Sequence, residues 1–118
     1  MKKILIGILV SILVLGSVAA YISQSYPHEA KAGQSNTFIV TLFNHGNSRV
    51  KDARVTGYIP YLDVRGRSDT FKLRSNEADR TYLEMDIPDT NPDFYPLILT
   101  LTNSDGVRER KHSWIYIS

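Results

Sequence analysis

The stretch from Ile4 to Ile22 constrains this chain more than any other, because it contains no charged residue and directly follows Lys2 and Lys3. A helix of that length spans roughly 28 Å, about the hydrocarbon thickness of a bilayer. Lysines on the N-terminal side of such a segment keep that end inside the cell and place the rest of the chain outside. The sequence therefore predicts a hydrophobic helix over residues 1–22, followed by an extracytoplasmic domain.

Two fates of this segment fit the sequence. A signal peptide has a basic start, a short apolar stretch and small residues before the cut, and cleavage after Ala19 or Ala20 matches that template. A retained single-span anchor matches the continuation of the apolar run through Tyr21 and Ile22, because tyrosine suits the membrane interface. We prefer the anchor, which makes this a single-pass membrane protein spanning the membrane through residues 4–22. The alternative is a secreted domain.

The charge balance argues against nucleic acid as a partner. The chain has 14 Lys and Arg against 12 Asp and Glu, and removing Lys2 and Lys3 leaves 12 of each sign in the exported part. A neutral domain is poorly suited to neutralising phosphates. The chain contains no cysteine, so it has no disulfide and no lipoprotein anchor, and a hydrophobic core must hold the fold.

The exported part has the pattern of an all-β protein. Residues 23–34 are polar and predict a linker or first edge strand, with a turn at Ala32-Gly33-Gln34. Residues 35–118 alternate short β-branched and aromatic runs with Gly, Asn, Asp and Pro, which is typical of an antiparallel β-sandwich. We expect seven strands, or eight if Tyr26–Lys31 adds one. The seven are placed at 36–44, 50–59, 61–65, 70–73, 81–87, 95–102 and 107–117.

Individual side chains can be assigned to the core from this alternation. In the run 81–87, Leu83, Met85 and Ile87 occupy every second position and are expected to point inward. Tyr95 opens an apolar strand after a proline-rich turn. We predict that it forms a tyrosine corner, with its hydroxyl bonded to the backbone upstream.

Turn segments punctuate these strands in a characteristic order: Ala32-Gly33, Asn44-His45-Gly46-Asn47, Ile59-Pro60, Met85-Asp86-Ile87-Pro88 and Asp93-Phe94-Tyr95. This pattern, which covers nearly all of the exported part, resembles the CARDB-like immunoglobulin-type domains of archaeal and bacterial cell-surface proteins. The resemblance implies an Ig-like sandwich with a role in adhesion, spacing or assembly at the cell surface. One anchor with one such domain is also similar to small surface-layer-associated proteins of archaea.

One segment has the spacing of a metal loop. Asp89, Asn91 and Asp93 match the D-x-N-x-D start of a calcium loop, in which alternate oxygens face one ion. However, Phe94 occupies the position of the loop glycine, and Pro92 stiffens the segment. A plain turn explains the segment better, and the three residues are kept as metal candidates beside that interpretation.

Catalytic patterns are missing from the sequence. There is no Cys nucleophile and no G-x-S-x-G elbow. The three histidines lack the short spacings that bring zinc ligands together. We therefore predict that the protein is not an enzyme and uses no cofactor.

Exposed aromatic and basic residues supply candidate interaction surfaces. Tyr58, Tyr82 and Trp114 are candidate platforms for a sugar or a protein partner. A basic set on the predicted edge strands would discourage edge-to-edge pairing. This basic set consists of Arg65, Arg67, Lys72 and Arg74. Together with Arg108, Arg110 and Lys111 of the last strand, the set could instead bind acidic glycans or anionic headgroups.

Three functions follow from these observations. The first is a membrane-anchored extracytoplasmic Ig-like module that contacts a surface protein or surface layer without catalysis. The second is a secreted carbohydrate-binding module that uses the three aromatic residues. The third is an anchored subunit of an extracellular filament or motility stator, docked through an open sheet edge.

Overall fold

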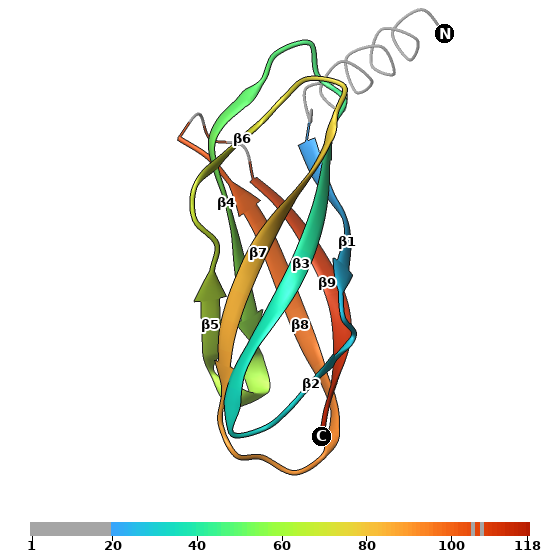
Figure 1. Ribbon diagram of the computed structural model, residues 1–118, viewed down its shortest axis with the longest axis vertical. Helices are drawn as coiled ribbons and strands as arrows, with labels where there is room; N and C mark the ends of the chain where they lie inside the picture. Colours follow the sequence, from blue (N-terminus) through green and yellow to red (C-terminus); the bar gives the residue numbers. More distant parts are fainter. Residues whose placement is uncertain (1–19, 105, 107) are drawn as a thin grey trace, which may run out of the picture.

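Strands account for nearly all regular structure in the computed structural model, which describes residues 20–104, 106 and 108–118 (Figure 1). Residues 1–19 of the predicted hydrophobic helix lie outside the described residues. No described helix is long and apolar enough to cross a membrane. A 3-10 turn, η1 (Pro60–Leu62), lies between two of the strands. The strands are β1 (Ala20–Tyr26), β2 (Glu29–Ala30), β3 (Gln34–Asn44), β4 (Val50–Ile59), β5 (Val64–Arg67), β6 (Phe71–Leu73), β7 (Ala78–Ile87), β8 (Asp93–Thr102) and β9 (Arg108–Ile117).

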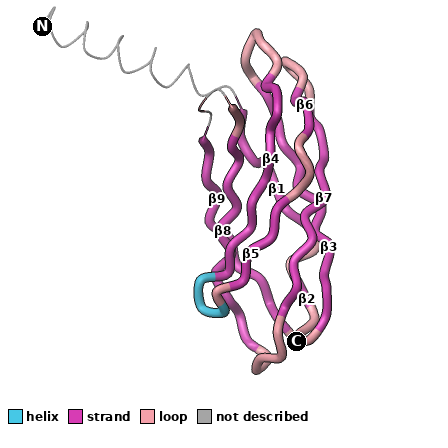
Figure 2. The backbone as a smooth tube through the Cα atoms, turned by 90° about the vertical axis from the view of Figure 1, so that its left-hand side faces the viewer, coloured by secondary structure: helices cyan, strands magenta, loops and turns pink. Residues whose placement is uncertain are grey.

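The strands form two sheets that pack face to face (Figure 2). The smaller sheet has the order β1-β3-β7, and the larger has the order β2-β9-β8-β4-β5, with β6 also paired to β4. All pairs are antiparallel except β2 with β9. The prediction of an all-β sandwich is confirmed, and a strand is found at or beside each of the seven predicted positions and within Tyr26–Lys31. The predicted count of seven or eight is too low for the described residues, because β1 begins inside the uncharged run.

The first strand corrects the predicted domain boundary. Residues 20–22 were assigned to the hydrophobic helix and residues 23–34 to a linker or first edge strand. An edge strand paired with β3 is found, but it covers Ala20–Tyr26 and so begins inside the predicted helix. Ala20 and Ile22 are 0% and 5% exposed, and they belong to the core. At the end of a long apolar run, the sequence pattern of a short strand cannot be distinguished from the pattern of a hydrophobic helix. Within the described residues, the sandwich therefore includes the chain from Ala20 onward and does not wait until residue 35.

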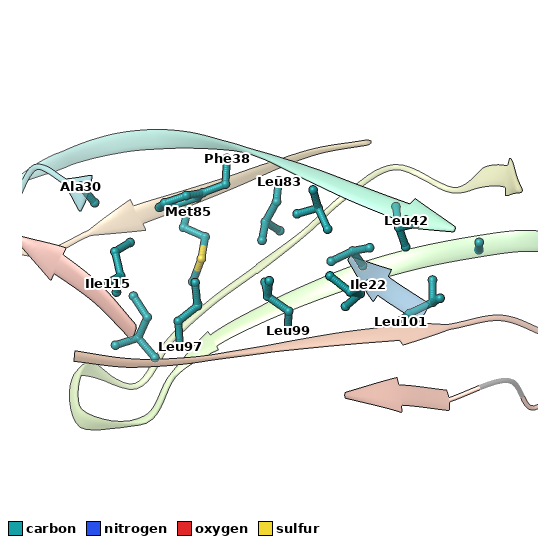
Figure 3. Close-up of a cluster of buried hydrophobic side chains, with 14 of the residues drawn as sticks. Ile22, Ala30, Phe38, Leu42, Leu83, Met85, Leu97, Leu99, Leu101 and Ile115 are labelled. Carbon is teal, nitrogen blue, oxygen red and sulfur yellow. The ribbon is translucent and has the colours of Figure 1, made fainter. Parts of the chain in front are cut away.

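The core lies between the two sheets (Figure 3). Leu83, Met85 and Ile87 all point inward from β7 as predicted, each at most 2% exposed. They meet side chains from β3, β4, β8 and β9. Fully buried members from these strands include Phe38, Leu42, Val55, Leu99, Leu101 and Ile115.

One side of the sandwich is closed by a close approach of β5 to β7. A Cβ added at Gly66 would collide with the backbone carbonyl oxygen of Glu84 and lie 2.6 Å from Cγ of Met85. A Cβ at Gly57 on β4 would also be tight, but it would meet only side-chain ends, 2.8 Å from Leu83 Cδ2 and 2.9 Å from Met85 Sδ. Flexible side-chain ends can move aside more easily than a backbone carbonyl.

This difference predicts unequal costs for the same substitution at two glycines. We expect Gly66→Ala to lower the free energy of unfolding by about 1–3 kcal/mol, because β5 must move away from β7. We expect Gly57→Ala to cost less, because the side-chain ends of Leu83 and Met85 can shift while β4 stays in place. Denaturant unfolding of the detergent-solubilised full-length chain, followed by circular dichroism, measures both values. Equal costs would show that β5 does not rest on the β7 backbone.

Candidate interaction surfaces

The outer face of the larger sheet gathers five arginines. Antiparallel pairing sets Tyr58 opposite Arg65 and Thr56 opposite Arg67 at one side of the sheet. At the other side, β8 threonines oppose β9 arginines. We call this surface the arginine face. It consists of Arg54, Arg65, Arg67, Arg108 and Arg110.

A shallow groove of about 400 Å³ crosses the arginine face. Thr56, Thr100 and Thr102 contribute hydroxyl groups to its lining. The guanidinium carbon of Arg65 lies 4.0 Å from the ring centroid of Tyr58, which is a cation–π contact. The tyrosine ring thus supports one wall of the groove instead of standing free as a platform.

The predicted basic set is divided between two places. Arg65 and Arg67 belong to the arginine face, whereas Lys72 and Arg74 line a separate hollow of about 640 Å³ with Arg49 and other residues. That hollow lies at β6 and the turns beside it, because Leu73 pairs with Val50 at the start of β4. The set is therefore not one continuous surface. Pairing of β6 with β4 instead of β5 separates its halves.

Lys111 is also directed away from the arginine face. Its Nζ donates a hydrogen bond to the backbone carbonyl of Ser23, at 2.7 Å. This bond links β9 to β1 across the side of the sandwich opposite to β5.

The three predicted aromatic platforms do not converge. Tyr58 on β4 and Trp114 on β9 lie on the outer face of the larger sheet, at positions that alternate with buried neighbours. Tyr82 points outward from β7 in the smaller sheet and is 65% exposed. The outer faces of the two sheets point in opposite directions. A single sugar platform made of these three rings is therefore wrong.

Tyr82 instead belongs to a second surface on the smaller sheet. Tyr26 and Tyr82 oppose Ile39 from either side, on β1 and β7. Both tyrosines are more than 60% exposed, and a hollow of about 790 Å³ lies beside them, lined in part by Thr41 and Arg80. We call Tyr26, Ile39 and Tyr82 the tyrosine face. Tyr26 was not predicted as a surface residue because it lies in the segment 23–34, although the polar Gln24 and Tyr26 occupy alternate positions around Ser25.

Hydrogen bonds hold the Asp89–Asp93 loop in place. The Tyr95 hydroxyl donates to the Asn91 carbonyl at 2.9 Å and lies 2.9 Å from Oγ1 of Thr90, which confirms the tyrosine corner. The Asp93 carboxylate accepts a bond from the Phe94 N–H at 2.7 Å. Within the described part of the chain, no three His, Asp or Glu side chains come together as a metal site.

Comparisons with known proteins identify the fold only through structure. No family model matches the chain, and no curated protein matches its sequence. The CARDB domain of a Pyrococcus furiosus protein, crystallised in complex with di-metal ions, is 14% identical. It covers 85% of this chain and 86% of its own, with a TM-score of 0.53.

Two further solved structures share this architecture. The archaellum periplasmic stator complex of FlaF and FlaG from Sulfolobus acidocaldarius matches with a TM-score of 0.53 at 9% identity, covering 80% of this chain and 88% of that one. The alkylpurine DNA glycosylase AlkC of Pseudomonas fluorescens, bound to DNA, matches with a TM-score of 0.58 at 16% identity, over 89% of this chain but 32% of its own. Such a range of proteins on one architecture means that the fold fixes no function. As the turn pattern predicted, the chain has a CARDB-like fold.

Proposed function

We propose that this protein is a membrane-anchored module of the outer cell surface that contacts a protein partner or surface layer without catalysis. The observation that carries the proposal is the junction between the apolar segment and the sandwich. Ala20 and Ile22 end the uncharged stretch and are core residues of β1, so the stretch continues directly into the domain and leaves residues 4–19 for the membrane. A segment retained in the bilayer would therefore hold the sandwich close to the outer membrane surface.

The same junction favours retention over cleavage. A cut after Ala20 would remove a residue that is 0% exposed and pairs with Asn44 at the end of β3. A cut after Ala19 would place a new charged amino group on that buried residue itself. Both outcomes would weaken the edge strand that completes the smaller sheet.

The tyrosine face is the surface best suited to a protein partner. Tyrosine and arginine are enriched in protein interfaces and among the residues that dominate binding energy. Tyr26 and Tyr82 flank the half-buried Ile39, with Arg80 beside the hollow. This combination of exposed rings around an apolar centre resembles the core of a small interface with a polar rim.

A subunit of an extracellular filament or motility stator is the second candidate. The structural likeness to the archaellum periplasmic stator complex favours it. The open edge of β1, which pairs only with β3 among the described strands, would be the docking edge. A filament subunit would contact copies of itself, whereas the first proposal requires a different protein.

Photo-crosslinking in the native membrane tests both statements. A photoreactive phenylalanine derivative is placed at Tyr26 or Tyr82, and at Tyr61 as a control on η1 that is 78% exposed. We expect full-length protein in the membrane fraction and a discrete adduct from the first two positions only. A chain that begins at Ala20 or Tyr21 in the medium would overturn the anchor. The same adduct from Tyr61 would overturn the tyrosine face, and an adduct between two copies would favour the filament.

A further inference from the structure

We propose that the arginine face is a binding site for a linear acidic polysaccharide, one whose sugars carry carboxylate or sulfate groups. This site is independent of the anchor and of the tyrosine face, and it lies on the other sheet. The charge, the shape and the side-chain chemistry of the outer surface of β4, β5, β8 and β9 support it.

The charge of this face is one-sided although the domain as a whole is neutral. In a strand, every second side chain points to the same face. The described outward positions of β4, β5, β8 and β9 hold the five arginines of the arginine face. Two carboxylates lie only at its margins: the exposed Asp52 on β4 before Arg54, 3.5 Å from the Ser104 hydroxyl, and Asp63 after η1, 3.5 Å from the Tyr58 hydroxyl. Acidic residues cluster elsewhere, for example Glu84 and Asp86 on the outer side of β7. The face therefore presents a concentrated positive potential that attracts an anionic chain.

The arginines form two rims with a hydroxyl-bearing floor between them. Arg108 and Arg110 stand on β9, and Arg65 and Arg67 stand on β5. The two rims are three strand spacings apart, roughly 14 Å, and successive outward residues along a strand are roughly 6.7 Å apart. The groove between the rims is floored by the threonines of β4 and β8. An extended chain fits this channel, whereas a compact ligand would leave most of the arginines unused.

The chemistry of the channel matches an acidic sugar polymer. The guanidinium group presents a planar fork of donors that binds a carboxylate or sulfate through two parallel hydrogen bonds. The threonine hydroxyls can both donate to and accept from sugar hydroxyls. Arg54, next to this floor, has a buried Nε without a hydrogen-bond partner. Arg54 does not line the groove, and it contributes positive charge beside it.

An aromatic continuation favours sugar over peptide. Beyond Ile98 and His112, the same face carries Pro96 and Trp114, and the Trp114 side chain is 62% exposed. An exposed indole offers a flat apolar surface to the carbon side of a sugar ring. An extended acidic peptide would instead gain affinity by adding a strand at a sheet edge. The groove lies on the face of the sheet, away from its edges.

The test uses the full-length chain in uncharged detergent, with sodium alginate as the acidic polysaccharide and dextran as the neutral one. We expect alginate to bind and dextran not to bind in isothermal titration calorimetry, and affinity to fall as salt is raised. The variant Arg65→Gln with Arg110→Gln removes one cation from each rim, and we expect it to weaken binding about tenfold or more.

A matched variant removes the same charge elsewhere. Arg49→Gln with Arg74→Gln changes the hollow beside β6 and leaves the arginine face intact. We expect less than about a twofold change, because exposed charges more than a Debye length away are largely screened. If both variants lost the same alginate affinity, the effect would come from net charge alone, and the proposed site would be overturned. Polyglutamate or single-stranded DNA binding as tightly as alginate would overturn the assignment to polysaccharide. None of these outcomes depends on membrane retention, so failure here is distinguishable from failure of the anchored module.

Discussion

Replacing Phe38 with alanine is expected to lower the free energy of unfolding by about 3–5 kcal/mol. Phe38 is 1% exposed and reaches from β3 into the space between the sheets, where Met85 lies nearby (Figure 3). Truncation removes the whole buried ring and leaves a cavity that packed neighbouring side chains cannot fill. With no disulfide in the chain, nothing covalent offsets the loss.

Phe94 provides the matched control for this substitution. It is the same residue type in a strand, but its side chain is 64% exposed on β8. We expect Phe94→Ala to change the free energy of unfolding by less than about 1 kcal/mol. Both values are measured by denaturant unfolding of the full-length chain. If Phe38→Ala cost no more than Phe94→Ala, the core between the sheets would not be the main source of stability.

The fold was predictable where alternation and turn residues agree. The segment 81–87 alternates cleanly, so the inward positions of Leu83, Met85 and Ile87 followed from period two alone. Tyr95 was predictable for the same reason, since a tyrosine corner depends on residues close by in sequence. The start of β1 was not predictable, because Ala20 and Ile22 end an uncharged run whose length already suits a membrane helix.

The interaction surfaces were less predictable because they depend on which strands are neighbours. Alternation predicts on which side of its strand Arg65 or Arg110 lies. It does not show that β4 and β8 lie between the strands that carry these two residues. It likewise cannot show that Tyr58 and Tyr82 belong to different sheets. Pairings between strands distant in sequence decide both points. The local pattern therefore predicted which side chains face outward, but only partly which of them share one surface.

Asn44→Ala is expected to lower the free energy of unfolding by about 2–4 kcal/mol, because it removes a hydrogen-bonding centre that is 0% exposed. The Asn44 Nδ2 group donates to the carbonyls of Ser48 and Leu73, at 2.9 and 3.3 Å. Its Oδ1 accepts from the Gly46 N–H at 2.9 Å. The side chain thus fastens the turn after β3 to the end of β6, and alanine would leave all three partners without this bond.

Asn36 is the control that separates burial from hydrogen bonding. Its side chain also bonds to backbone groups, accepting from the Lys31 N–H and donating to the Lys31 carbonyl, each at 2.9 Å. Those bonds are exposed, so water can replace them, and we expect Asn36→Ala to cost about 1 kcal/mol or less. Hydrogen exchange of the amide groups of Gly46 and Asn76 should also accelerate in Asn44→Ala, since Asn76 donates to the Asn44 carbonyl at 2.7 Å. Equal costs at the two asparagines would mean that water reaches Asn44, and that the turns at this end of the sandwich open without loss of the core.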